Sequence, residues 1–183
     1  MTANPRVIGL DLSLTATGVA DFGPNTLDIT TIRSKPATTI TGTWQRLNYI
    51  IGEIIQAIGD GPRPTLITIE GPSFGSKGAG TWDRAGLWWR VASHLIGDGH
   101  PIAVIPPATL KRYAAGRGNA TKTDMAVALA KRAGGLELRD DNQVDAWWLA
   151  AAGRDHLGCP VVDMPQAHRA ALGKADWPEV TGA

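Results

Sequence analysis

The sequence predicts a single α/β domain built on a mixed five-stranded sheet that is flanked by helices. Three short apolar runs come first and are separated by turn-forming residues, which indicates an antiparallel meander. Patterns typical of helices and strands then alternate, which indicates a parallel extension of the same sheet. With 183 residues, 43% of them hydrophobic and 19% charged, the chain has the length and composition of one globular domain with a sizeable core.

Short runs rich in apolar and β-branched residues predict the strands, at residues 7–10, 18–22, 27–32, 66–69 and 102–105. The sequence Gly-Pro-Asn at 23–25 forms the turn between the second and third strands. The last two strands each follow a helical segment, as parallel strands do.

Five helices are predicted, at residues 43–59, 82–96, 108–115, 123–133 and 144–156. In the first, five isoleucines recur at helical spacing and give one packed stripe. Segments rich in Gly and Pro at 61–64 and 116–118 mark helix ends. We expect residues 1–158 to form the domain and residues 159–183 to form a C-terminal tail that packs on it or extends from it.

Four acidic residues stand where two strands and a helix would present them to one pocket. Asp11 and Glu70 end apolar runs, while Asp141 and Asp145 open an apolar helix four residues apart. The first strand is expected to be central with the Glu70 strand beside it, so the two acids are expected to be neighbours. Clustered carboxylates repel one another, by roughly 4 kcal/mol per pair at about 4 Å and an effective dielectric near 20. Such a cluster predicts bound cations or raised pKa values, and hard oxygen ligands favour Mg²⁺ or Mn²⁺.

Each acid also has a purely structural interpretation. Asp11 precedes Ser13 and Thr15 and would cap a turn. Asp141 would be an N-cap or a first-turn acid favoured by the helix dipole. Asp145 is harder to explain in this way, because the almost wholly apolar residues 146–152 follow it and it is expected to face the interior.

The basic residues are concentrated in one segment of an otherwise balanced chain. The net charge is +1, yet residues 111–132 contain six Lys or Arg residues and a single Asp. A phosphate-binding surface and a solvated helix face explain this segment equally well.

Sequence features outside the acidic and basic groups indicate a cytoplasmic protein. Cys159 is the only cysteine, so no intrachain disulfide forms, as expected in a reducing compartment. Residues 1–6 are polar, which does not fit a signal peptide, and no apolar run approaches membrane-spanning length.

Four stretches together resemble the RuvC-type Holliday junction resolvases of the ribonuclease H-like superfamily, especially the divergent forms of bacteriophages. They are GLDLSLTATGVA at 9–20, IEGPSFG at 69–75, PPATLKRYAAGRGNATKTDM at 106–125 and DDNQVDAWWLAAA at 140–152. The stretches follow the order and spacing of the family, and the resemblance covers residues 6–157. It implies a ribonuclease H-like sheet and a phosphodiester hydrolase with two Mg²⁺ or Mn²⁺ ions in each active site.

The resemblance implies that Asp11 and Glu70 are the first two metal ligands and that Asp145 is the last. In typical members the third acidic ligand lies three residues before the last, where this chain has Asn142. Asp141 can take over that role, and we favour it because a charged oxygen binds a hard cation better than a neutral amide does. Asn142 supplying its carbonyl, and a site of three carboxylates, are the alternatives.

The DNA contacts implied by the resemblance fall in two segments. Lys111 and Lys122 match basic residues near the scissile phosphate, where Lys122 would stabilise charge in the transition state. Arg117 lies between them and is expected to contact DNA. In the loop after Glu70, Phe74 is the candidate for unstacking bases and Lys77 for contacting the backbone. A plain surface loop with Phe74 packed in the core is the alternative.

The resemblance also places a homodimer interface on the helix at 82–96. Trp88 and Trp89 are adjacent, so they cannot both face one core. One of them is expected to meet a partner subunit, unless the helix is packed on both sides.

We therefore predict a metal-dependent endonuclease that resolves Holliday junctions and other branched DNA as a homodimer. A nuclease of the same fold acting on flaps, forks or RNA–DNA hybrids is one alternative. Two alternatives of other classes are a non-catalytic junction-binding protein and a fragment of an actin-like sugar kinase, which would need a second phosphate-binding loop.

Overall fold

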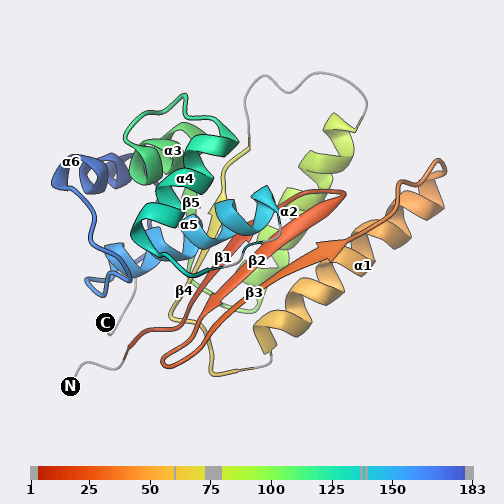
Figure 1. Cartoon of the computed structure of the whole chain (residues 1–183). Helices are drawn as coiled ribbons and strands as arrows, with labels where there is room; N and C mark the ends of the chain where they lie inside the picture. The colour runs from red at the N-terminus through yellow and green to blue at the C-terminus, as the bar shows by residue number, and fades with distance from the viewer. Residues whose placement is uncertain (1–3, 60, 73–79, 137, 139, 180–183) are drawn as a thin grey trace.

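The computed structural model describes residues 4–59, 61–72, 80–136, 138 and 140–179 of the chain (Figure 1). Phe74 and Lys77 lie outside these residues. Within the described part, no helix is long and apolar enough to cross a membrane.

A single five-stranded sheet, with strand order β3-β2-β1-β4-β5, forms the centre of the fold. The strands are β1 (Val7–Asp11), β2 (Ala16–Phe22), β3 (Leu27–Arg33), β4 (Leu66–Glu70) and β5 (Ile102–Ile105). β1, β2 and β3 pair antiparallel, whereas β4 pairs parallel with both β1 and β5. The predicted ribonuclease H-like mixed sheet is therefore confirmed, with strand bounds within about two residues of those expected.

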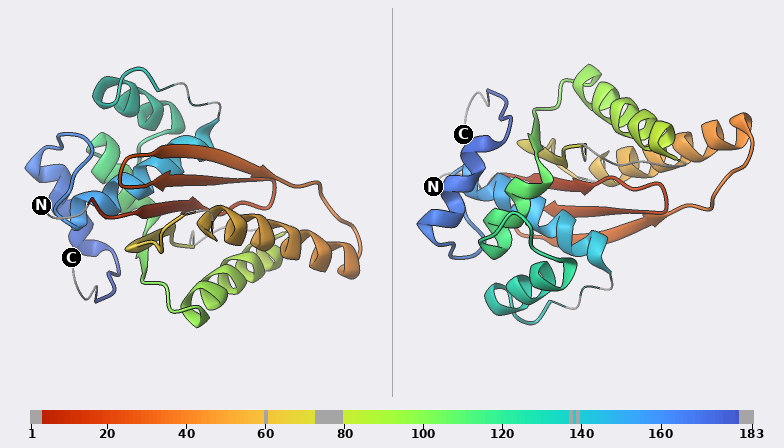
Figure 2. Two further views of the ribbon diagram at one scale, coloured as in Figure 1. Left: turned by 90° about the horizontal axis from the view of Figure 1, so that it is seen from below. Right: turned by 90° about the horizontal axis from the view of Figure 1, so that it is seen from above.

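Helices cover both faces of the sheet, so there are two apolar cores (Figure 2). The helices α1 (Ile40–Gly59) and α2 (Thr81–Gly97) pack on one face. The helices α3 (Pro107–Ala115), α4 (Lys122–Arg132) and α5 (Asp141–His156) pack on the other. Neighbouring strand residues alternate between the cores, as the pleat requires: Val7 belongs to one and Ile8 to the other.

The tail packs against the α3 side of the domain over the part that the structure describes. It contains α6 (Gln166–Arg169) and a 3₁₀ helix, η1 (Ala170–Lys174), both of which contact α3. Beyond them, Asp176 and Val104 of β5 exchange two backbone hydrogen bonds of 2.9 Å. The Trp177 ring stacks on His156 at 3.8 Å between centroids. These contacts tie the tail to α5 and to the edge of the sheet.

Candidate active site

Asp11 and Glu70 lie side by side at the carboxyl edge of the sheet. Each is the last residue of its strand, and the parallel register pairs Leu10 with Ile69 immediately before them. Because both chains run in the same direction, the two carboxylates leave the sheet at the same edge. The expected adjacency of the two acids is confirmed.

Two glycines bring α5 unusually close to the strands that carry this edge. A Cβ atom built on Gly9 would lie 2.1 Å from the Ala146 carbonyl oxygen, and one built on Gly18 would lie 2.1 Å from the Asn142 carbonyl oxygen. Only glycine permits this approach. Since Gly18 is paired with Asp11 in the sheet, the close contact places the first turns of α5 directly over Asp11.

Asn142 contacts Asp11 in this arrangement. The hydrogen-bond network orients the amide so that its nitrogen donates to Asp11 Oδ2 at 3.3 Å and to the Ala16 carbonyl oxygen at 3.2 Å. Asp145 lies one turn further along α5 and is partly buried, as its apolar sequence context predicted. The start of α5 therefore contributes one amide and one carboxylate to the edge that holds Asp11 and Glu70.

The three carboxylates form one electrostatic unit. Burial, followed by the charges of Glu70 and Asp145, raises the pKa of Asp11 well above its usual value. Burial and then the charge of Asp145 raise the pKa of Glu70 to about 7. Burial also raises the pKa of Asp145. Three buried acids with raised pKa values, two of them raised further by the charge of a neighbouring acid, make this edge of the sheet a candidate functional site.

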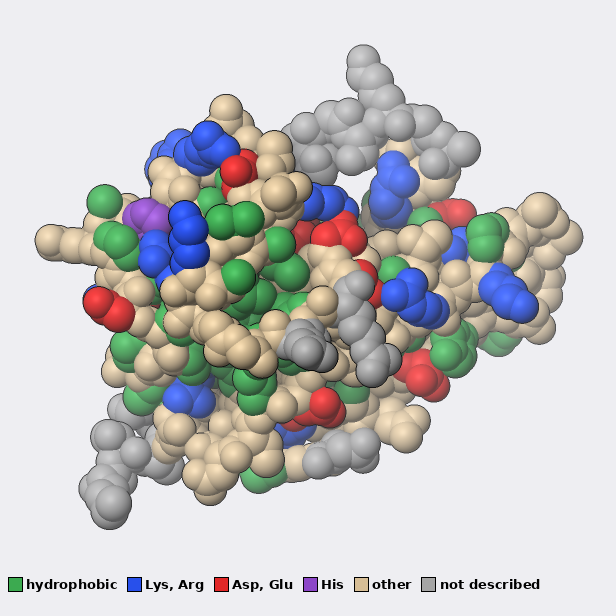
Figure 3. All heavy atoms as spheres, in the orientation of Figure 1, with side chains coloured by type: hydrophobic (Ala, Val, Ile, Leu, Met, Phe, Trp, Pro, Cys, Tyr) green, Lys and Arg blue, Asp and Glu red, His purple; other side chains and the backbone are tan. Residues whose placement is uncertain are grey.

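Two lysines partly offset this repulsion. Lys122 is the first residue of α4 and lowers the pKa of all three acids; Lys111, on α3, lowers the pKa of Glu70 and Asp145. A capping box fixes the start of α4, because the Thr121 hydroxyl accepts from the Asp124 amide and the Asp124 carboxylate accepts from the Thr121 amide. Near the centre of the face in Figure 3, acidic and basic side chains lie next to each other close to the start of α5.

Asp141 has a different partner from the other acids. Its carboxylate forms an ion pair with Lys122, and it is not among the charges that shift the pKa of Asp11, Glu70 or Asp145. The N-cap of α5 is the preceding Asp140, which accepts from the Gln143 amide at 3.0 Å and pairs with Arg33 at 2.7 Å. Thus Asp141 is a first-turn residue that contacts the basic side of the site.

Trp88 is a site residue that the sequence did not reveal. Its indole Nε1 donates to the Glu70 carbonyl oxygen at 2.9 Å and so fixes the chain where β4 ends. Trp89, by contrast, is 64% exposed, as expected for two adjacent tryptophans on one helix. The one signal in the sequence that could have identified Trp88 as the inward-facing tryptophan is its helical spacing from apolar residues of α2. These residues, Leu87, Val91 and Leu95, are buried.

The donor chemistry of the site suits a hard divalent cation, although the side chains do not form a closed site. Asp11, Glu70 and Asp145 offer only carboxylate oxygens, which Mg²⁺ and Mn²⁺ prefer. In the described part of the chain, no group of three Asp, Glu, His or Cys side chains converges on a position that could hold a metal ion. The residues therefore fit the chemistry of the metal, and ligands other than these side chains would have to complete its coordination.

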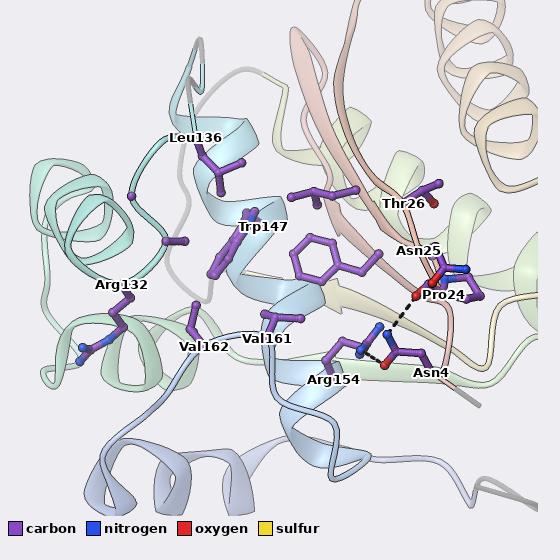
Figure 4. A pocket seen from close by; sticks show the side chains of 15 residues that line it. Asn4, Pro24, Asn25, Thr26, Arg132, Leu136, Trp147, Arg154, Val161 and Val162 are labelled. Atoms are coloured by element: carbon purple, nitrogen blue, oxygen red, sulfur yellow. Dashed lines mark hydrogen bonds between the residues drawn. The ribbon is translucent and has the colours of Figure 1, made fainter. Parts of the chain in front are cut away.

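A separate cavity of about 470 Å³ lies at the other end of the sheet, beside the β2–β3 turn (Figure 4). Phe22, Trp147 and Arg154 line it together with turn residues 23–26. Its lining is mainly apolar, and the described residues that line it include no carboxylate. The cavity is thus not part of the acidic site.

The fold is that of the RuvC-type resolvases within the ribonuclease H-like class. The structure of Thermus thermophilus RuvC matches 87% of this chain and 99% of its own at a TM-score of 0.64 and 19% identity. T. thermophilus RuvC in complex with a Holliday junction substrate matches 88% of this chain and 99% of its own at a TM-score of 0.68 and 19% identity. The yeast mitochondrial Holliday junction resolvase Ydc2 matches 80% of this chain and 76% of its own at a TM-score of 0.53 and 13% identity. Neither a protein-family model nor a curated protein sequence matches the chain.

Proposed function

We propose that the protein is a metal-dependent endonuclease of the cytoplasm that resolves Holliday junctions and other branched DNA by phosphodiester hydrolysis. The observation that carries this proposal is the cluster of Asp11, Glu70 and Asp145 beside Lys111 and Lys122. Burial raises the pKa of all three acids, and the charges of neighbouring acids raise those of Asp11 and Glu70 further. Bound cations stabilise carboxylates that lie this close together, and the positive charges of the lysines can attract a phosphate group. The likeness of fold to two Holliday junction resolvases supports the choice of substrate.

Asp11, Glu70 and Asp145 would hold Mg²⁺ or Mn²⁺, with two ions in each site. When bound, the ions supply positive charge for the reacting phosphate and lower the pKa of water. Asn142 holds the Asp11 carboxylate in position through its amide N–H. Trp88 holds the end of β4, and with it Glu70, through the backbone.

Lys122 is the residue that we assign to the phosphate under attack. Its side chain is 70% exposed, so it can reach a DNA strand that lies across the carboxylates. Lys111 is partly buried and contributes fixed positive charge next to Glu70. Both side chains would counter the negative charge that develops on the phosphate in the transition state.

The contacts of Asp141 favour a role in positioning Lys122. An ion pair between side chains that are 70% and 39% exposed contributes at most about 1 kcal/mol. A DNA phosphate can therefore displace Asp141 at little cost, and Asp141 keeps Lys122 near the site until DNA arrives. Asp141 as a third acidic metal ligand is the competing role, and the two are separated by experiment below.

A homodimer fits both the substrate and the surface of α2. Trp82 is 90% exposed, Trp89 is 64% exposed and Ile96 is 61% exposed, which leaves large apolar side chains of this helix uncovered in one chain. A four-way junction has two equivalent strands to cut, and a twofold dimer presents two identical sites to them. We propose that α2 forms that interface.

Cleavage of labelled DNA by the purified protein tests the proposal. Four-way, three-way and flap DNA and an RNA–DNA hybrid are incubated with Mg²⁺, with Mn²⁺ or with a chelator. We expect metal-dependent cutting of the four-way junction at paired positions, and no cutting by the Asp11→Asn variant. Stronger cutting of flaps or hybrids would show that the protein is a nuclease for that substrate instead. Junction binding without cutting in either metal would show that it binds junctions without catalysis.

A further inference from the structure

A basic cleft runs along α4, from Asp124 in the first turn of the helix to Arg132 at its end. It has a volume of about 350 Å³ and opens between α3, α4 and α6. The Lys and Arg residues that line it belong to the basic segment noted in the sequence: Arg117, Lys131 and Arg132. His168 of α6 also lines the cleft. Figure 3 shows Lys and Arg side chains gathered around a histidine on this side of the molecule.

The one acid in the lining of the cleft, Asp124, is already fully engaged. It pairs with Arg117 at 2.6 Å and accepts from the Thr121 amide and hydroxyl, each at 2.8 Å. The Arg117 hydrogen bond and then the Thr121 bonds lower the pKa of Asp124 to about 2. Three cations thus face a single carboxylate, which leaves the cleft with two net positive charges.

Those two charges belong to Lys131 and Arg132. Among the residues that the structure describes, neither side chain forms an ion pair. The Arg132 Nε–H is buried and has no acceptor among the residues that the structure describes. Buried donors nearly always have partners, so this one indicates a bound acceptor such as a water molecule or an anion.

A hydrogen bond positions His168 on the wall of the cleft that α6 provides. The His168 Nδ1 is 2.7 Å from the Tyr113 carbonyl oxygen, so this nitrogen carries the proton that is donated. A Cβ atom on Gly116 would lie only 2.9 Å from His168 Nε2, and Gly116 has the positive φ of 83° that ends α3. The absence of a side chain at Gly116 keeps this wall open.

The distance from Lys122 to the far end of the cleft corresponds to a short length of duplex DNA. Lys122 and Lys131 are nine positions apart on α4, about 14 Å at the rise of a helix. A duplex rises about 3.4 Å for each phosphate of one strand, so this distance spans about four base pairs. A DNA arm lying along α4 would bring a phosphate to each end of the helix.

We propose that this cleft is a second phosphate site, which binds the sugar-phosphate backbone of a DNA arm about four base pairs from the cut. This assignment rests on the proposed function. The cleft would fix the direction in which the arm leaves the active site. It carries no information about base sequence, because phosphate contacts position DNA without reading it.

Binding of a four-way junction, measured in a chelator so that no strand is cut, tests the assignment. Lys131→Ala and Arg132→Gln are compared with Arg63→Gln, which removes an exposed charge just before β4, where Arg63 donates to the Asp98 carbonyl oxygen. Each protein is titrated across a range of salt concentrations. Two four-way junctions are used. The natural junction has an unmodified phosphodiester backbone, and the methylphosphonate junction has neutral methylphosphonates in place of the phosphates around the fourth base pair from the cut.

On the natural junction, we expect each cleft variant to bind more weakly and to lower the salt slope by about 1, while Arg63→Gln has no effect. On the methylphosphonate junction, wild type and cleft variants should bind equally. Equal losses on both DNAs, or no loss on either, would overturn the cleft assignment while leaving the proposed function intact. A wild-type protein that binds no branched DNA would overturn both.

Discussion

The carboxylate of Asp141 forms an ion pair with Lys122, and it is not among the charges that shift the pKa of Asp11, Glu70 or Asp145. Lys122, the residue proposed to meet the phosphate, is therefore already held beside the carboxylates by a partner from the start of α5. The amide of Asn142, the next residue, donates instead to Asp11. Two adjacent side chains thus serve two halves of the site, one basic and one acidic.

Replacing Asp141 with Asn separates the two roles proposed for this position. If Asp141 positions Lys122, the variant should keep cleavage within about tenfold of wild type, because only an exposed ion pair is lost. It should also bind junction DNA more tightly at low salt, since one negative charge near the backbone is gone. Single-turnover cleavage and fluorescence anisotropy measure the two quantities. Near-complete loss of cleavage with normal binding would instead make Asp141 a metal ligand.

Replacing Asn142 should give the opposite pattern. Asn142→Ala removes the N–H that holds Asp11, and we expect cleavage to fall by about ten- to a hundredfold, as for other groups that orient a metal ligand. Asn142→Asp adds an acid beside Asp11 and should tighten Mg²⁺ binding, seen as a lower Mg²⁺ concentration for half-maximal cutting. An alanine variant with wild-type cleavage would show that the Asn142 contact is unimportant.

Removing a carboxylate from the edge of the sheet should stop cutting but not binding. We expect Asp11→Asn and Glu70→Gln each to lower cleavage more than about a hundredfold, since the direct ligands matter more than the groups that orient them. Lys111, Arg117 and Lys122 remain, so affinity for a four-way junction should be kept or increased. A folded variant that loses affinity and cleavage in parallel would contradict a catalytic role.

The pKa of Glu70 predicts how stability depends on pH in the absence of metal. Since the folded protein raises this pKa from 4.5 to about 7, the native state binds more protons than the unfolded chain between these pH values. The free energy of unfolding should therefore fall as the pH rises through this window. At pH 8, Glu70→Gln should be more stable than wild type by up to about 3 kcal/mol, and the difference should vanish near pH 4.

Urea unfolding at several pH values measures this difference, with a chelator present. Added Mg²⁺ should then stabilise wild type more than Glu70→Gln at pH 8, because only wild type keeps the full set of acids. A variant that is equally stable or less stable than wild type at pH 8 would show that Glu70 is not under electrostatic strain.

The oligomeric state depends on α2 if the proposed interface is correct. Trp89→Glu places a charge on the exposed face of this helix and should convert a dimer into a monomer. Val127→Glu, at an exposed position of α4, is the matched control and should leave the dimer intact. Analytical ultracentrifugation at micromolar concentration decides the matter. A wild-type monomer at that concentration would contradict paired cutting by a dimer.

The sequence was sufficient for the sheet and for the placement of Asp11 and Glu70, because strand ends are marked by apolar runs and by the turn residues that follow. It was less informative about helix starts. α5 begins at Asp141, three residues before the predicted position, since Asp140 caps the helix and polar first-turn residues carry no apolar periodicity.

Side-chain partners across elements were beyond the reach of the sequence. Helical spacing places Asp141 and Asp145 on one face, which favoured a shared metal. It does not reveal that Lys122, from the start of a different helix, lies close enough to pair with Asp141. Likewise, the contact of Trp88 with the Glu70 carbonyl depends on how α2 packs on β4.

The glycines under α5 have a consequence for how such a site can change. At Gly9 and Gly18, the helix rests on main-chain atoms of the strands, so the spacing between Asp145 and Asp11 is set by backbone thickness. Any side chain at Gly18 would lift the start of α5 and move Asn142 away from Asp11. Mutations in the surrounding core can therefore alter stability while the acids keep their spacing, because Gly9 and Gly18 set the distance between α5 and the strands that carry Asp11.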